Sequence, residues 1–129
     1  MGKILVVNDQ FGVRSLLVSI FQDDGHEVKM AANGEAALSL LSSFEPDLIM
    51  LDMKIPGMDG IETLEKIRVS GCRAAVIMMT GGDDPHNVEQ AKELGILGYL
   101  AKPFDLFELR ERVKEILNSS GIIAEGLTS

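Results

Sequence analysis

The sequence predicts an α/β domain built on a doubly wound, five-stranded parallel sheet. Five short apolar runs alternate with five amphipathic segments along the chain. Two of these runs, 47–52 and 74–80, are apolar on both faces, as strands buried between two helix layers must be. The length of 129 residues suits one domain with one core. Strict β/α alternation then implies right-handed crossovers and helices on both sides of the sheet.

The predicted strands are the short runs rich in Val, Ile, Leu and Met. In chain order they are 3–7, 26–32, 47–52, 74–80 and 98–102. The first is a continuous apolar run, whereas the second alternates only weakly between apolar and polar residues and the fifth is short.

The predicted helices are the segments between the strands in which apolar residues recur with helical spacing. They cover 11–23, 34–43, 60–69, 84–94 and 105–118. Gly25, Gly71 and Gly95 follow helical stretches, as C-terminal capping glycines do. Asp105, with Glu108 three residues later, forms a capping box that starts the last helix.

The domain organisation is predicted to be simple. Residues 1–118 form the single domain, and residues 119–129 lack periodicity and are predicted to be a C-terminal tail. We find no internal repeat, no linker and no output domain after the fifth helix.

The net charge, the cysteine count and the N-terminal sequence indicate which kinds of partner and location to expect. The net charge of −8 and pI of about 4.7 disfavour nucleic-acid binding, and suit both ordinary solubility and a cation-binding site. Cys72 is the only cysteine, so no intramolecular disulfide can form. No signal peptide is visible, and the first apolar run is too short to span a membrane. We therefore expect a cytoplasmic protein with neither membrane nor nucleic-acid partners.

Polar side chains follow four of the five predicted strands. Asn8 and Asp9 end the first strand, Asp52 the third, Thr80 the fourth and Lys102 the fifth. Each alone is ordinary, because an isolated Asp after a strand is usually a turn or cap residue. Together they should meet, since ligands of open α/β sheets bind at the carboxyl ends of the strands.

This set of groups suits phosphoryl transfer. Asp9 and Asp52 offer the oxygen ligands that Mg²⁺ prefers, and a cation between them would relieve their repulsion. Lys102 can contact a phosphoryl oxygen as a point charge, and Thr80 can donate a hydrogen bond to the same group. A carboxylate in these surroundings can attack phosphorus and form an aspartyl phosphate.

The blocks "NDQ", "LDMKIPGMDGIE", "MTG" and "AKPFD" resemble the signature blocks of response-regulator receiver domains. The resemblance runs in order through residues 3–118, and it is strongest to the single-domain receivers of sporulation phosphorelays. It implies a flavodoxin-like (βα)5 fold. It also implies a domain that catalyses its own phosphorylation, taking a phosphoryl group from a phosphohistidine of a sensor histidine kinase with Mg²⁺. The group is then passed to a histidine phosphotransferase, or the domain signals by binding a partner.

The resemblance also assigns roles at the predicted metal site. Asp52 would be the phosphoacceptor and a metal ligand, Asp9 a direct Mg²⁺ ligand, and the backbone carbonyl of Lys54 the third protein ligand. Asn8 stands where the family usually has an acid, and it would act through a metal-bound water. This departure indicates weaker Mg²⁺ binding, and it leaves open a degenerate receiver that acts as a phosphorylation-independent binding module.

Further roles follow from the same resemblance. Thr80 would be the switch hydroxyl, Lys102 the phosphoryl-contacting amine and Tyr99 the aromatic switch residue. The resemblance also suggests a surface on which a partner helix docks, although ordinary burial is equally compatible with the apolar members of the set. The candidate docking residues are Gln10, Val13, Leu16, Pro103 and Phe104.

Two other classes of protein share this topology. A flavodoxin-like cofactor protein is disfavoured, because the first strand is not followed by a loop rich in Gly, Ser and Thr that would hold a phosphate. A hydrolytic aspartate phosphatase needs a second acid two residues after its nucleophile, and that position holds Lys54.

Overall fold

The structure, a computed structural model, describes residues 2–55, 57–80, 85–101 and 105–125. Three predicted site or docking residues, Lys102, Pro103 and Phe104, lie outside the described residues, as does the side chain of Thr80.

Five strands alternate with five helices, as the sequence predicts. The strands are β1 (Lys3–Val7), β2 (Glu27–Ala31), β3 (Leu48–Asp52), β4 (Ala75–Thr80) and β5 (Gly98–Ala101). The helices are α1 (Phe11–Asp23), α2 (Gly34–Phe44), α3 (Gly60–Val69), α4 (Pro85–Glu93) and α5 (Leu106–Glu125). Across the described ranges, no helix is both long and apolar enough to cross a membrane.

All strand pairs are parallel, and the strand order is β2-β1-β3-β4-β5. The chain leaves β1 towards β2 on one side and returns to β3 on the other, so the winding reverses between β1 and β3. In sheets of this order, the crevice for ligands opens at the carboxyl ends of these two strands. The predicted doubly wound sheet is confirmed.

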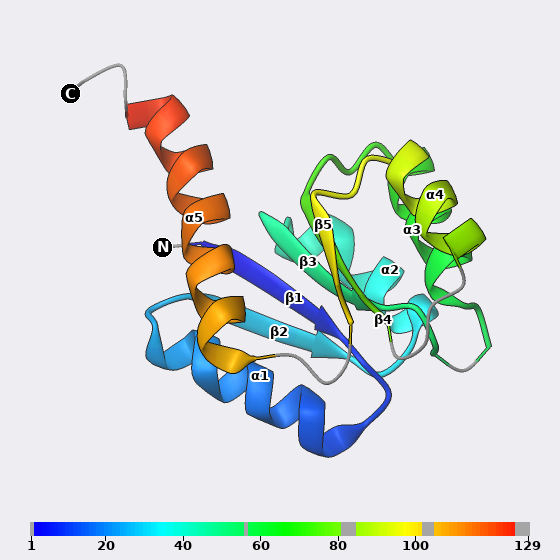
Figure 1. Ribbon diagram of the computed structural model, residues 1–129, viewed down its shortest axis with the longest axis horizontal. Helices are drawn as coiled ribbons and strands as arrows, with labels where there is room; N and C mark the ends of the chain where they lie inside the picture. The colour runs from blue at the N-terminus through cyan, green and yellow to red at the C-terminus, as the bar shows by residue number, and fades with distance from the viewer. Residues whose placement is uncertain (1, 56, 81–84, 102–104, 126–129) are drawn as a thin grey trace.

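The sheet carries a core on each face. Leu5, Val7 and Leu51 pack towards α2, α3 and α4, whereas Val6 and Met50 pack towards α1 and α5. Figure 1 shows the two helix layers on opposite sides of the sheet. Every residue of β3 is buried, which explains why this strand is apolar on both faces.

The predicted capping glycines and the N-cap at Asp105 are present. Gly25, Gly71 and Gly95 have φ values of 92°, 93° and 85°, in the left-handed region that glycine adopts without strain. At the start of α5, the carboxylate of Asp105 accepts hydrogen bonds from the backbone N–H groups of Phe107 (2.8 Å) and Glu108 (3.3 Å).

Helix α5 is longer than predicted, because it continues to Glu125 through part of the segment expected to be a tail. The sequence Ser119-Ser120-Gly121 interrupts the apolar periodicity, and these residues are weak helix formers. In Figure 1 the last turns of α5, drawn in orange to red, extend beyond the sheet. The boundary between domain and tail therefore stays a prediction.

An ion pair ties the first half of α5 to the end of α1. The guanidinium of Arg110 donates to both carboxylate oxygens of Asp24, at 3.0 and 2.5 Å. This hydrogen bond holds the pKa of Asp24 below its ordinary value. The pair is solvent-exposed, so water and salt screen it and we expect it to contribute little to stability.

We predict that His26 makes the fold sensitive to mild acid. Its Nδ1 accepts a hydrogen bond from the backbone N–H of Gly2 (3.1 Å), and partial burial lowers its pKa below 6.5. The unfolded state therefore binds more protons than the folded state between the lowered pKa and about 6.5. As a result, the free energy of unfolding should fall as pH drops through this range. Urea denaturation at several pH values measures the effect.

His26→Asn is the matched control, because Asn keeps an acceptor but does not titrate in this range. The slope of stability against pH between about 6.5 and 5 should flatten in this variant. An unchanged slope would show that other groups cause the acid sensitivity.

Candidate functional site

The candidate site lies where the carboxyl ends of β1 and β3 meet. Val6 pairs with Met50 and Val7 with Leu51, so Asn8 continues β1 at the level of Asp52. Neighbouring strands are about 4.8 Å apart, which makes these two residues close neighbours at the edge of the sheet.

Asp52 is a buried acid. It is the last residue of β3 and is 1% exposed, after four residues that are fully buried. Its Oδ1 accepts a hydrogen bond from the backbone N–H of Lys54 at 3.0 Å. A carboxylate is expensive to bury unless polar groups or charges surround it, so its burial at the edge of a core indicates a prepared polar site.

Asn8 and Asp9 differ in burial. Asn8 is 0% exposed, and its Oδ1 accepts a hydrogen bond from the backbone N–H of Gln10 at 2.8 Å. Its own backbone N–H donates to the carbonyl of Ala31, and its carbonyl accepts from the guanidinium of Arg14. Asp9, in contrast, is exposed. The amide is thus fixed inside the fold, and the acid lies at the surface beside it.

The amide nitrogen of Asn8 is buried and has no hydrogen-bond partner within the described part of the chain. The bond from Gln10 N–H fixes the orientation of the side chain, because a flipped amide would bring two donors together. A buried donor without an acceptor costs free energy, so this atom marks a place where a polar ligand would be favourable.

Gly60 brings the start of α3 against the loop that follows Asp52. Its N–H donates to the carbonyl of Met53 at 2.9 Å. A Cβ at this position would lie 2.5 Å from Cα of Met53 and 2.7 Å from the carbonyl oxygen of Asp52. Sequence reasoning missed this role, because the "MDGIE" block does not reveal what approaches its glycine.

The two predicted switch residues lie on the neighbouring strands. Asp52 pairs with Met79 in the sheet register, so the backbone of Thr80 follows at the next position of β4. Tyr99 lies in β5 and is 43% exposed, with its backbone paired to Met78.

The described docking residues lie along the start of α1. Gln10 and Leu16 are exposed, and Val13 is half-buried. Phe11 is 68% exposed and lies against the guanidinium of Arg14. Leu17 and Phe21 on the same helix are fully buried, and Val13 packs against the core cluster that contains them.

The donors at the site are suited to a hard cation. The predicted ligands are the carboxylates of Asp9 and Asp52 and the carbonyl of Lys54, and all are oxygen donors of the kind that Mg²⁺ prefers. Three grouped His, Cys, Asp or Glu side chains are not found anywhere in the described ranges. Mg²⁺ needs only one or two protein carboxylates and keeps several waters, so the predicted ligands are of the right type and number for it.

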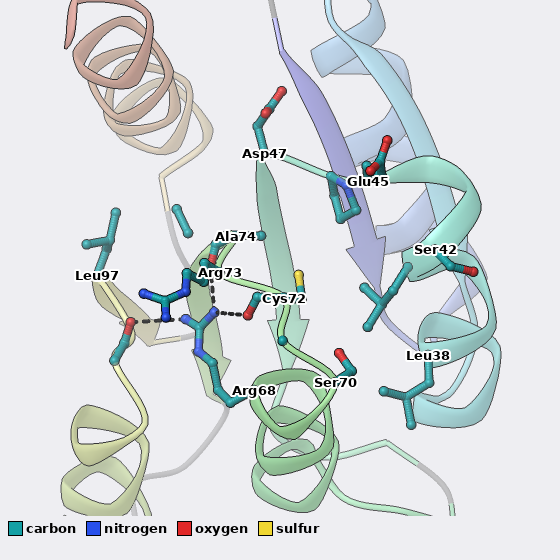
Figure 2. A pocket seen from close by; sticks show the side chains of 15 residues that line it. Leu38, Ser42, Glu45, Asp47, Arg68, Ser70, Cys72, Arg73, Ala74 and Leu97 are labelled. Atoms are coloured by element: carbon teal, nitrogen blue, oxygen red, sulfur yellow. Dashed lines mark hydrogen bonds between the residues drawn. The ribbon is translucent and has the colours of Figure 1, made fainter. Parts of the chain in front are cut away.

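A pocket of about 860 Å³ lies at the opposite edge of the sheet. There Arg68 donates to the carbonyls of Cys72, Ala74, Leu94 and Gly95, and Figure 2 shows its guanidinium among the turns that precede β4 and β5. Because the donors of Arg68 are directed at the backbone, this side chain stabilises the two turns. Nothing in the sequence pattern indicated it, since its acceptors are main-chain atoms.

Residues 4–114 match the family model of the response regulator receiver domain. The chain belongs to this family. It is 47% identical over 115 residues to sporulation initiation phosphotransferase F of Bacillus subtilis (strain 168), with 89% of this chain and 93% of that protein covered.

Solved receiver structures have the same fold. A CheY-like receiver domain protein from Methanospirillum hungatei is 29% identical with a TM-score of 0.87, over 92% of this chain and 95% of that chain. Chemotaxis protein CheY4 of Vibrio cholerae is 30% identical with a TM-score of 0.83, over 90% of this chain and 98% of that chain.

These comparisons confirm the predicted family and fold class. The chain is a receiver domain of two-component and phosphorelay systems. The alternative of a degenerate receiver gains no support from them. The roles of individual residues remain predictions that rest on the geometry of the site.

We predict that Gly60→Ala destabilises the receiver, because the added methyl group overlaps backbone atoms that cannot move away freely. Overpacking of this kind typically costs about 1–3 kcal/mol. Denaturant unfolding measures the effect, and the backbone amide of Lys54 in an NMR spectrum reports whether the loop after Asp52 has moved.

Gly12→Ala is the control. Gly12 lies in the first turn of α1, and no other described segment of the chain comes within 4 Å of the added Cβ, so the better helix former should leave stability unchanged or raise it. Equal destabilisation by both substitutions would contradict the close approach at Gly60.

Proposed function

We propose that this receiver is a phosphorelay intermediate that accepts a phosphoryl group on Asp52 and passes it to a histidine phosphotransferase. The observation that carries the proposal is the burial of the Asp52 carboxylate at the point where the sheet reverses its winding, beside Asn8 and Asp9. The similarity to a protein named as a phosphotransferase of sporulation initiation supports it.

In this proposal Mg²⁺ is held by the carboxylates of Asp9 and Asp52 and the backbone carbonyl of Lys54, with Asn8 near its water shell. When bound, the ion would supply positive charge that offsets the negative charge of the carboxylates and of the phosphoryl group. Asp9 is exposed and Asp52 buried, so one carboxylate is open to incoming ions and the other is held in place for reaction.

The transfer itself is a displacement at phosphorus. An oxygen of Asp52 forms a bond to phosphorus, the phosphorus–nitrogen bond of the phosphohistidine breaks, and its electron pair stays on the imidazole nitrogen. Lys102 compensates negative charge on the phosphoryl oxygens, and the hydroxyl of Thr80 donates a hydrogen bond to one of them. The backbone N–H of Lys54, already bonded to Asp52, keeps the carboxylate oriented.

The proposed partners are a sensor histidine kinase and a histidine phosphotransferase. The proposed docking surface consists of Gln10 at the N-cap of α1, Val13 and Leu16 on α1, and Pro103 and Phe104 after β5. The net charge of −8 disfavours nucleic acid as a partner. A cytoplasmic location suits the unpaired Cys72.

A second candidate is a stand-alone regulator that binds a target when phosphorylated. The exposure of Tyr99 on β5 and Phe107 on α5 favours it, because both aromatic rings are available to a partner. A transfer assay separates the two functions: a relay intermediate loses its phosphoryl group to a histidine phosphotransferase, and a regulator keeps it.

We predict that Asp52→Asn abolishes phosphorylation by acetyl phosphate. An amide of the same shape cannot act as the nucleophile. Intact-mass spectrometry should show a Mg²⁺-dependent gain of one phosphoryl group in the natural protein and none in the variant. Undiminished labelling of the variant would refute Asp52 as the acceptor.

We predict that Lys102→Ala keeps the fold but blocks phosphorylation or the response to it. Removing the amine leaves excess negative charge at the site, so the metal-free variant should also melt at a lower temperature. Circular dichroism checks the fold, and a partner-binding assay after phosphodonor treatment checks the response. Normal partner binding would contradict the role of Lys102.

We predict that Asn8→Asp binds Mg²⁺ more tightly. A third acid near a divalent ion adds about 1 kcal/mol or more of attraction, which is roughly a fivefold decrease in Kd. Without metal the added charge increases repulsion, so the variant should melt lower, and Mg²⁺ should then stabilise it more than the natural protein. Thermal melting of both proteins across a Mg²⁺ titration is the measurement. Equal affinity would show that position 8 does not face the metal.

A further inference from the structure

Only one of the two polar atoms in the Asn8 side chain has a hydrogen-bond partner within the described residues. Its Oδ1 accepts the Gln10 N–H, whereas its Nδ2 is buried and lacks an acceptor in the described ranges. Because Asn8 is 0% exposed, solvent does not satisfy this donor from the surface. An acceptor that enters the site would therefore satisfy this donor.

The sheet register shows which group is near. Val6 and Met50 are paired and both contribute to the core on the α1 and α5 side. Asn8 and Asp52 follow two residues later on the same two strands, so the alternation of side chains brings them to the same face. Asn8 is thus next to the carboxylate that receives the phosphoryl group.

The Nδ2 group of Asn8 is a hydrogen-bond donor, and this determines which kind of ligand atom it can bind. A water bound to Mg²⁺ directs its oxygen lone pair at the metal and offers protons, so it needs an acceptor. The Nδ2 group has two N–H bonds and cannot accept. The oxygens of a phosphoryl group, which carry negative charge, are strong acceptors for such a donor.

We propose that Asn8 Nδ2 donates a hydrogen bond to an oxygen of the phosphoryl group on Asp52. This inference rests on the proposed function and deepens it, because it makes Asn8 a residue that contacts the transferred group. An acid at this position has no N–H to give. Compared with an acid at position 8, the amide attracts Mg²⁺ less but stabilises the phosphorylated state directly through this hydrogen bond.

The direct test observes the amide protons of Asn8 by ¹⁵N NMR, with the side-chain signals assigned by their loss in Asn8→Asp. Spectra are recorded for the metal-free protein, with Mg²⁺ alone, and with Mg²⁺ and beryllofluoride as the phosphoryl mimic. One side-chain proton should shift downfield and exchange more slowly with water only when beryllofluoride is present. The same change with Mg²⁺ alone, or no change when the mimic binds, would overturn the inference.

Two variants distinguish the loss of the hydrogen bond from the effect of an added charge on beryllofluoride affinity. At saturating Mg²⁺, both Asn8→Asp and Asn8→Ala should bind beryllofluoride roughly tenfold or more weakly, the effect of losing one hydrogen bond to a charged group. Asn8→Asp keeps the acceptor for Gln10, and Asn8→Ala adds no charge. Weakening in Asn8→Asp alone would mean that repulsion is the cause, and would overturn the inference.

The proposed function is checked independently by Mg²⁺-dependent labelling of Asp52 in the natural protein. If Asp52 is labelled but the Asn8 amide does not respond, the inference about Asn8 fails alone. If Asp52 is not labelled, the proposed function fails and the inference about Asn8 fails with it.

Discussion

A carboxylate at the buried end of the central strand is the constraint on which the rest of this structure depends. Asp52 is 1% exposed, and the strand that carries it is covered by helices on both faces. Such a group is tolerated only where hydrogen bonds and charges compensate its lost hydration. The reversal of winding between β1 and β3 supplies this place, because it opens a crevice at the carboxyl edge of an otherwise closed sheet.

Some of the groups around Asp52 are fixed by hydrogen bonds and packing, whereas others are exposed to solvent. The loop after it is held by the Lys54 N–H and by the close approach of Gly60, so the carboxylate has little freedom. Asn8 is fixed by Gln10 and by its burial, while Asp9 next to it faces solvent. The proposed function relies on both features, because a fixed Asp52 carboxylate is ready to react and an exposed Asp9 carboxylate is accessible to ions.

The fold could be predicted from the sequence because most strands and helices are marked by a local sequence pattern. The apolar run of β3 requires two helix layers, and Gly25, Gly71 and Gly95 mark the ends of three helices. The end of α5 was predicted too early, because Ser and Gly residues with low helix propensity interrupt the apolar pattern of a helix that continues to Glu125.

At the site, residue types alone predicted that Asn8, Asp9 and Asp52 come together. They did not reveal which atom of Asn8 remains open, nor the backbone contacts of Gly60 and Arg68, since these depend on packing between distant segments.

The most direct test of the account is to locate the phosphoryl group in the natural protein. The protein is treated with acetyl phosphate with and without Mg²⁺, the acyl phosphate is trapped by borohydride reduction, and the modified residue is identified by peptide mass spectrometry. We expect modification at Asp52 alone and only with Mg²⁺. Modification of Asp9 or Asp59 instead, or equal modification without the metal, would contradict the central claim that the buried carboxylate at the end of β3 is the acceptor.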